Sequence, residues 1–167
     1  MRVLAGTILA ASVSLAMPAF AGEQYVDTTG YAVSGHDVVA YFDLGEDEAA
    51  VPGRAEFTAE WNGAKFAFDS AANRDRFIAE PAAFAPQYDG HCAYGVAKGG
   101  KVPGNPDLWR IVDGKLYLNI TENVVGFWEE DIPGNITMSE ANWTGLEPLA
   151  ASADPIPQYA PDAPIAN

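Results

Sequence analysis

The stretch from Trp61 to Ser70 reads Trp-Asn-Gly-Ala-Lys-Phe-Ala-Phe-Asp-Ser, and it decides the fold. Apolar and polar residues alternate on both sides of Asn62-Gly63, over residues 57–61 and again over residues 65–68. An Asn-Gly pair supplies the positive φ angles that a two-residue hairpin turn requires. The pattern therefore predicts a β-hairpin.

The same logic predicts a second hairpin further along the chain. Asp113-Gly114 separates Trp109-Arg-Ile-Val112 from Lys115-Leu-Tyr-Leu118, two mainly apolar stretches, which suits the same kind of tight turn. Ser and Thr N-caps and prolines mark the bounds of helices. Helices are predicted from Ser70 to Glu80, from Thr121 to Pro133 and from Asn135 to Trp143. Hairpins interspersed with short helices indicate an α+β fold with a small antiparallel sheet. No internal repeat is evident in the sequence.

The two ends of the chain differ in composition from this region. A positive start, an apolar run and Ala19-Phe20-Ala21 predict a secretory signal peptide over residues 1–21, cleaved between Ala21 and Gly22. The apolar run is shorter than the roughly 18 residues of a membrane-spanning helix. Residues 148–167 hold five prolines and no Lys or Arg, which is typical of an irregular, acidic tail. We therefore expect one folded domain over residues 22–147, without a transmembrane segment, in a periplasmic or secreted protein.

Composition excludes several classes of function. The chain has 23 acidic and 9 basic residues, a net charge of −14, so we expect it to bind neither nucleic acid nor an anionic membrane surface. Its one Cys can form no internal disulfide and no four-thiolate metal site. With 49% hydrophobic residues, the chain is rich enough in apolar side chains to bury a core.

Few side chains could carry metal or thiol chemistry, and the candidates are His36, His91 and Cys92. In a regular strand the adjacent side chains of His91 and Cys92 would point to opposite faces, whereas in a turn or at a helix start they could converge. A helix starting there, or a protonated His91, would lower the pKa of the thiol. If His36 also approached, the His₂Cys set would suit copper before zinc. Met138 lies too far beyond Cys92 for the ligand loop of a cupredoxin.

Several motifs resemble, in order, those of a YHS domain, and more closely those of the exported proteins known as YHS domain-containing (seleno)proteins. They are Trp61–Ser70, Asn73–Phe77, Pro81, Phe84–Tyr88, Gly90–Ala93, Trp109–Asn119 and Asp131–Gly134. The resemblance implies a small metal-binding module. The cysteines that usually flank the YHS core are absent, since the matching positions are Phe66, Ala67 and Ser70. Cys92 matches a position that some relatives fill with selenocysteine, which implies a reactive or metal-binding sulfur.

Three hypotheses follow for the mature protein. The first is metal binding, with copper preferred over zinc. The ligands would be Cys92 and His91, joined by His36 if it lies close enough, and the partner would be a metal ion or a small molecule. The second is a thiol-redox protein in which Cys92 is the nucleophile and His91 tunes its pKa. The third is an interaction module without catalysis, in which Cys92 is inert.

Overall fold

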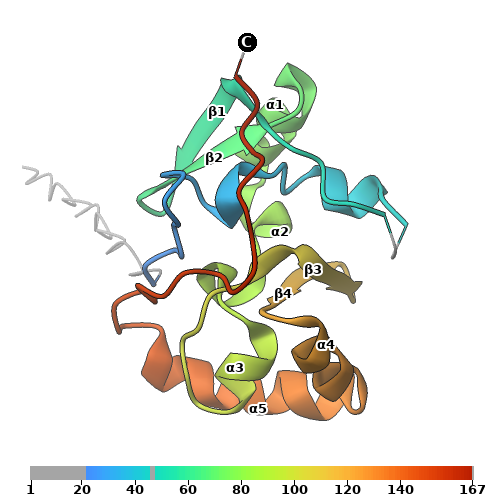
Figure 1. The fold of residues 1–167 in the computed structure, drawn as a ribbon, viewed down its shortest axis with the longest axis vertical. Coiled ribbons are helices and arrows are strands. Elements are labelled where there is room, and N and C mark those ends of the chain that lie inside the picture. The colour runs from blue at the N-terminus through green and yellow to red at the C-terminus, as the bar shows by residue number, and fades with distance from the viewer. Residues whose placement is uncertain (1–21, 46–47, 167) are drawn as a thin grey trace, which may run out of the picture.

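The computed structural model describes residues 22–45 and 48–166 (Figure 1). The first half of the domain contains the 3₁₀ helices η1 (Val33–Gly35) and η2 (Ala40–Asp43), the strands β1 (Arg54–Trp61) and β2 (Ala64–Phe68), and the helices α1 (Ala71–Ala79) and α2 (Pro81–Phe84). The second half contains η3 (Gln87–Gly90), α3 (Ala93–Ala97), β3 (Asn105–Val112), β4 (Lys115–Asn119), α4 (Glu122–Glu129) and α5 (Ile132–Leu146). The predicted α+β class is confirmed. The predicted signal peptide lies outside the described residues.

Both predicted hairpins form, each as its own two-stranded antiparallel sheet. Their turns place Asn62 at φ 47° and Gly63 at φ 75°, and Asp113 at φ 49° and Gly114 at φ 71°. These are the positive angles for which such dipeptides are selected. β1–β2 and β3–β4 therefore do not merge into one small sheet, and the helices and the shared core hold them together.

The helix prediction was wrong at Pro133. The helix expected to run from Thr121 to Pro133 ends as α4 at Glu129, and α5 begins at Ile132 rather than at Asn135. Asp131 caps α5 by accepting a hydrogen bond from Gly134 N at 3.0 Å. A proline fits the first turn of a helix, where its missing N–H has no partner to lose. Pro133 therefore opens a helix here instead of ending one.

The two halves are structural repeats, although the sequence shows no repeat. In the first hairpin Arg54 pairs with Phe68, and after a bulge the pairing resumes from Thr58 with Ala67. In the second hairpin Asn105 pairs with Asn119, and after the same bulge the pairing resumes from Trp109 with Leu118. Each pair of the second hairpin thus lies 51 positions after its counterpart, in the same register. A helix follows each hairpin, α1 and α4 respectively.

The repeat extends to the loop before each hairpin. The N–H of His36 donates to the carbonyl of Val33 at 3.0 Å, and the N–H of His91 donates to the carbonyl of Tyr88 at 3.0 Å. A hydrogen bond between two glycine backbones is also present in both halves. Gly53 N donates to Gly35 O, and Gly104 N donates to Gly90 O, both at 3.0 Å. His36-Asp37 and His91-Cys92 therefore occupy equivalent places in the two halves.

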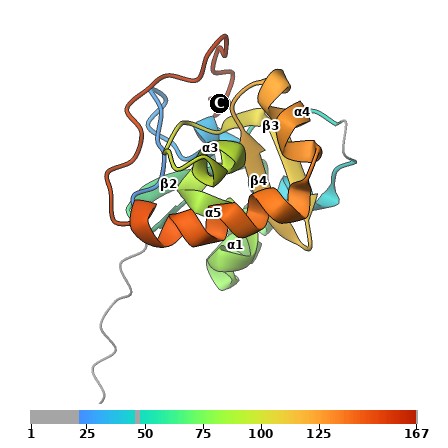
Figure 2. The same cartoon turned by 90° about the horizontal axis from the view of Figure 1, so that it is seen from below.

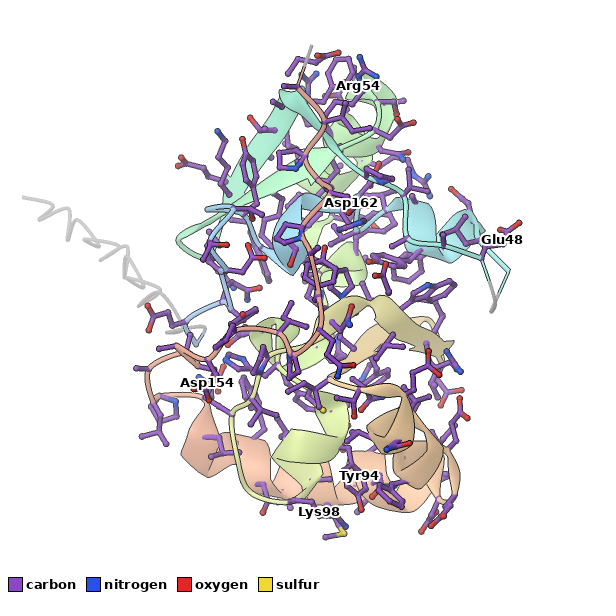
Figure 3. The ribbon with its side chains drawn as sticks, in the orientation of Figure 1. Glu48, Arg54, Tyr94, Lys98, Asp154 and Asp162 are labelled. Atoms are coloured by element: carbon purple, nitrogen blue, oxygen red, sulfur yellow. The ribbon has the colours of Figure 1, made fainter. Side chains whose placement is uncertain are left out.

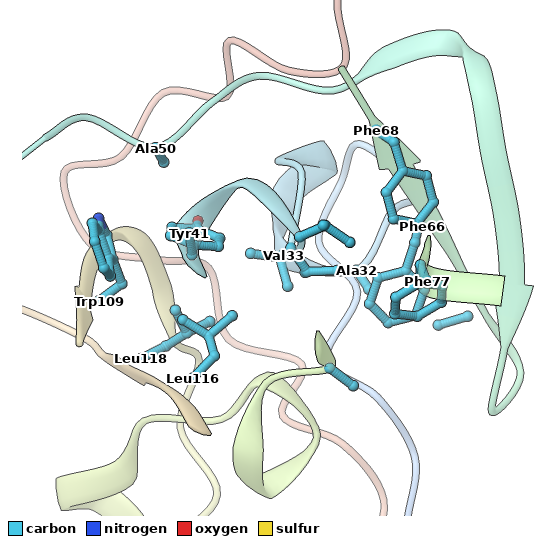
Figure 4. Packing of buried hydrophobic residues seen from close by; sticks show 14 residues of the cluster. Ala32, Val33, Tyr41, Ala50, Phe66, Phe68, Phe77, Trp109, Leu116 and Leu118 are labelled. Atoms are coloured by element: carbon cyan, nitrogen blue, oxygen red, sulfur yellow. The ribbon is translucent and has the colours of Figure 1, made fainter. Parts of the chain in front are cut away.

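One core joins the two halves. Its buried side chains come from both hairpins, from α1 and from the segment that holds η1 and η2, and the largest are Phe66, Phe68, Phe77, Tyr41, Trp109, Leu116 and Leu118 (Figure 4). A second cluster, which contains Trp128, Tyr117 and Val96, lies where α3 packs on α5 (Figure 2). This second cluster lies beside the segment that carries Cys92.

The proline-rich tail is part of the folded unit. Residues 148–166 run from the end of α5 back along both halves towards β1 (Figure 1). Ile165 is bound on both sides, because its N–H donates to Gly53 O at 2.7 Å and its carbonyl accepts from Ala55 N at 2.9 Å. Ile156 and Ala163 are buried. Within the described part of the chain, no helix combines the length and the apolar character needed to cross a membrane.

Candidate functional site at Cys92

Cys92 is the N-cap of α3 and is completely buried. Its sulfur accepts a hydrogen bond from the N–H of Gly95 at 3.3 Å, and the N–H groups of Tyr94 and Ile120 also face the sulfur and act to lower its pKa. We call these three donors the amide cluster of Cys92. Of the two arrangements considered for this residue, a turn and a helix start, the structure has the helix start, with the sulfur in the place of a capping oxygen.

Burial and the amide cluster act on the thiol in opposite directions. Burial raises the pKa of Cys92 and outweighs the hydrogen bonds from Gly95, Ile120 and Tyr94, which lower it. The N–H groups at the helix start thus act in the expected direction, but burial outweighs them and the net shift of the thiol pKa is upward. In the closed fold Cys92 is a thiol, and its S–H donates to Asn119 Oδ1 at 3.5 Å.

In the other half, the place of Cys92 is taken by a carboxylate. Asp37 Oδ1 accepts from Val39 N at 2.9 Å and Ala40 N at 3.2 Å, and Oδ2 accepts from Asp69 N at 2.9 Å. These donors are the repeat counterparts of Tyr94, Gly95 and Ile120. An amide cluster of the same construction thus surrounds an anionic side chain in one half and a sulfur in the other.

Asn119 is a further polar group at the sulfur. Its side chain is fully buried, and its Oδ1 accepts from Tyr94 N at 3.2 Å. Its Nδ2 has no hydrogen-bond partner among the described residues. A buried donor without a partner costs free energy. At the first half's carboxylate, the amide of Asn73 fills the corresponding role by donating Nδ2 to Asp37 Oδ2 at 2.8 Å.

His91 does not share the environment of its neighbour. Its backbone is extended, with φ −81° and ψ 156°, so its side chain leaves on the opposite side from that of Cys92. Nδ1 lies 2.8 Å from the carbonyl of Tyr88, and Nε2 lies 3.1 Å from the N–H of Ser152 in the tail. These partners fix the neutral tautomer with the proton on Nδ1.

Burial also sets the charge of His91. Burial lowers its pKa to about 4, with Lys101 acting in the same direction, while the Tyr88 carbonyl and Glu23 oppose it. The imidazole is therefore neutral at physiological pH. The condition under which His91 would lower the pKa of the thiol, a protonated ring, is therefore not met at that pH.

His36 is held in the same manner in the first half. Its Nδ1 lies 3.3 Å from the carbonyl of Val33, and its Nε2 lies 3.2 Å from Oδ1 of Asp162, which Figure 3 labels on the tail. Both histidines thus present Nε2 to the tail, at residues 152 and 162. No contact in the described part of the chain joins His36 to His91 or Cys92.

These positions bear on the predicted metal site. Within residues 22–45 and 48–166, no group of three or more His, Cys, Asp and Glu side chains is arranged to hold a metal ion. The metal-binding prediction for Cys92, His91 and His36 stays a prediction. Sequence reasoning singled out Cys92 but missed Asp37 and Asn119. The shared order of His-Asp and His-Cys before each hairpin is the signal that could have pointed to Asp37.

Comparison with known proteins adds little to this picture. No family model matches the chain. A non-reducing polyketide synthase, phnA of Penicillium herquei, is 31% identical over 130 residues, which covers 74% of this chain but 6% of that protein. No solved structure matches. The likeness to a small part of one very long fungal protein shows no family for this chain, and the resemblance to YHS domains stays a prediction.

Proposed function

We propose that this chain is an exported thiol-redox protein in which Cys92 is the redox-active sulfur. The observation that carries the proposal is the amide cluster of Cys92, whose counterpart in the other half surrounds the carboxylate of Asp37. Backbone N–H groups that converge on one point stabilise negative charge there. The predicted signal peptide supports the exported location.

Peroxide is the oxidant that fits a buried sulfur, because it is small. The thiolate attacks one peroxide oxygen, the O–O bond breaks, and Cys92 becomes a sulfenic acid while hydroxide leaves. A second peroxide oxidises the sulfenate to a sulfinate and releases water. A sulfinate carries two oxygens and one negative charge, like a carboxylate. The amide cluster and the free Nδ2 of Asn119 supply donors for those oxygens.

Recovery of the thiol from the sulfenic acid needs an external reductant, because Cys92 is the only cysteine in the sequence. A small thiol condenses with the sulfenic acid, which forms a mixed disulfide and releases water. A second thiol then attacks the mixed disulfide and returns Cys92 to its reduced form. The protein thus cycles with a soluble thiol and without an internal partner.

Asn119→Asp is expected to slow the oxidation of Cys92 by hydrogen peroxide roughly tenfold. The new carboxylate keeps the acceptor for Tyr94 N, removes the Nδ2 donor and sets a like charge beside the thiolate, a change worth about one pKa unit or more. The measurement is the rate at which the intact mass gains oxygen, with the sulfenic acid trapped by a dione reagent. Asn73→Asp places the same change at the cluster of Asp37 and serves as the matched control.

Cys92→Ser should gain no oxygen at position 92 and should form no adduct with the dione reagent under the same conditions. Equal oxidation rates in the Asn119 and Asn73 variants would contradict the role of the amide cluster. Peroxide exposure that oxidised the methionines while it left Cys92 reduced would contradict the proposed function itself.

Metal binding is a second candidate, which the tautomer of His91 favours. A histidine that binds a metal through Nε2 usually donates its Nδ1–H to a carbonyl or carboxylate, as His91 does to Tyr88. Nδ1 of His36 also faces a carbonyl, that of Val33, but its Nε2 faces the carboxylate of Asp162, which is an acceptor. In both, a group of the tail now contacts Nε2, so binding would require the tail to move.

We expect the protein to bind one equivalent of Cu(I) more tightly than zinc. We expect Cys92→Ser to abolish this binding. Binding to a thiolate releases a proton, so the affinity should fall as the pH drops. Competition with a chromophoric Cu(I) chelator measures the affinity, and His36→Asn reports whether the second histidine takes part. The same affinity in the wild-type protein and in Cys92→Ser would rule out the proposed set of ligands.

A further inference from the structure

Asp89 carries a buried carboxylate oxygen that no described group satisfies. Its Oδ1 accepts from Gln24 Nε2 at 2.5 Å, whereas Oδ2 is buried without a hydrogen-bond partner among the described residues. Lys101 does not fill the gap, because its ammonium donates to the carbonyls of Glu147 and Leu149 at 3.4 and 2.7 Å. A buried carboxylate with an unpaired oxygen needs a donor, and a cation serves best.

Gly22 lies directly against this oxygen. A Cβ built on Gly22 would overlap Oδ2 of Asp89 and would lie 2.8 Å from the carbonyl of Glu147. Only a residue without a side chain can therefore approach so closely. Gly22 is also the residue that follows the predicted cleavage point after Ala21.

We propose that cleavage before Gly22 frees an α-ammonium group that forms an ion pair with the carboxylate of Asp89. The Cα of Gly22 is tetrahedral, so the built Cβ and the amino nitrogen are two of its substituents. A rotation of about 120° about the Cα–C bond brings the nitrogen to the place of the built Cβ. In the precursor the nitrogen is an amide bonded to Ala21, which carries no charge. Once freed, the amino group can turn towards Oδ2 and give that oxygen a charged donor.

The pair would link processing to the segment that carries the candidate site. Asp89 belongs to η3, where Tyr88 and Asp89 have φ angles of 56° and 54°, in the left-handed region that a bulky residue such as tyrosine seldom adopts. The carbonyl of Asp89 also accepts from Tyr25 N at 2.8 Å. An ion pair at Asp89 therefore stabilises a strained turn that leads directly to His91 and Cys92. This inference goes beyond the proposed function and shares with it only the predicted cleavage of the signal peptide, not the chemistry of Cys92.

The charged groups that face Asp89 set the expected pH dependence. They are Lys101, Glu147 and, on the N-terminal segment, Glu23, with the neutral His91 beyond the turn. With an amide at Gly22, burial raises the pKa of Asp89 to about 6, Lys101 opposes this, and Glu147 adds to it. A carboxyl whose pKa is raised by folding loses stability as the pH rises through that range. An ammonium partner reverses the sign, because it favours the ionised carboxylate.

The test compares two chains, one that begins at Gly22 and one that retains residues 16–21. At pH 7, Asp89→Asn is expected to lower the melting temperature of the first chain, by removing an ion pair. It is expected to raise the melting temperature of the second, by removing a buried charge. A shift in the same direction in both chains would overturn the proposal.

A chemical measurement on the wild-type protein tests whether the Gly22 amino group pairs with Asp89, and it does not require Asp89→Asn to fold. The ordinary pKa of an α-amino group is about 7.7–8.0. Pairing with Asp89 should raise it, so that acetylation of Gly22 at pH 8 is at least about tenfold slower than in a peptide of residues 22–28. Mass spectrometry of the N-terminal fragment measures the rate. Equal rates in the protein and the peptide would show that the amino group is free.

Discussion

Asp37→Ala is expected to destabilise the protein by about 3–5 kcal/mol, because it removes a buried charge and leaves its donors without an acceptor. The carboxylate is fully buried and accepts hydrogen bonds from Val39, Ala40, Asp69 and Asn73. It ties the start of η2 to the residues that precede α1, across the first hairpin. Denaturant unfolding followed by tryptophan fluorescence measures the loss, as a shift of the midpoint at constant slope.

Two variants make this result specific. Asp75→Ala removes a carboxylate from the exposed face of α1, where it pairs with Arg74, and should change the stability by less than about 0.5 kcal/mol. Asp37→Asn keeps one acceptor oxygen but turns an NH₂ group towards two donors, so its cost should fall between those of the alanine variants. A loss of less than about 1 kcal/mol for Asp37→Ala would contradict the structural role of the carboxylate.

The hairpins could be predicted because their information is local. Asn62-Gly63 and Asp113-Gly114 specify turns through the φ angles of two residues, and the alternating apolar residues beside them specify which face is buried. The N-cap at Ser70 is equally local, since its hydroxyl accepts from Asn73 N three residues later. Pro133 failed as a marker because a proline suits both the end of one helix and the first turn of the next.

The repeat could not be predicted because the two halves share conformations more than residues. The turn is Asn-Gly in one half and Asp-Gly in the other, and the residue before the helix is Ser70 in one and Thr121 in the other. The segments before the hairpins also differ in length, since His91 follows His36 by 55 positions whereas the hairpins are offset by 51. Different residues adopt the same backbone conformations in the two halves, so a single sequence shows no periodic pattern.

The surroundings of Cys92 were beyond sequence reasoning for a different reason. The sequence places His91 beside Cys92, but the extended backbone separates their side chains. The groups that do surround the sulfur include Ile120 and Asn119, which reach it only through the packing of β4 on α3. Burial then reverses the pKa shift that the helix start alone implies. Tertiary contacts, and not local spacing, therefore set the chemistry of this thiol.

Cys92 is expected to react with a bulky disulfide reagent on the order of 10³-fold more slowly in the folded protein than in the urea-unfolded chain, because core segments open with free energies of several kcal/mol. Two features act together. The sulfur is completely buried, and burial raises the thiol pKa, so the thiolate is scarce even where the reagent can enter. The rate should therefore continue to rise with pH beyond the range in which a free thiol has finished titrating.

An exposed thiol at the other end of the same helix provides the control. Lys98 lies at the exposed C-cap of α3, so a chain with Cys92→Ser and Lys98→Cys should react nearly as fast as a cysteine peptide.

Hydrogen peroxide should be hindered much less than the bulky reagent, because it needs a smaller opening to reach the sulfur. This difference separates the thiol-redox hypothesis from the hypothesis that Cys92 is inert. A redox-active sulfur is shielded from large reagents but oxidised by peroxide, whereas an inert core thiol is shielded from both to the same degree. Rapid reaction with the bulky reagent in the folded protein would show that the closed arrangement around Cys92 is not the one that exists in solution.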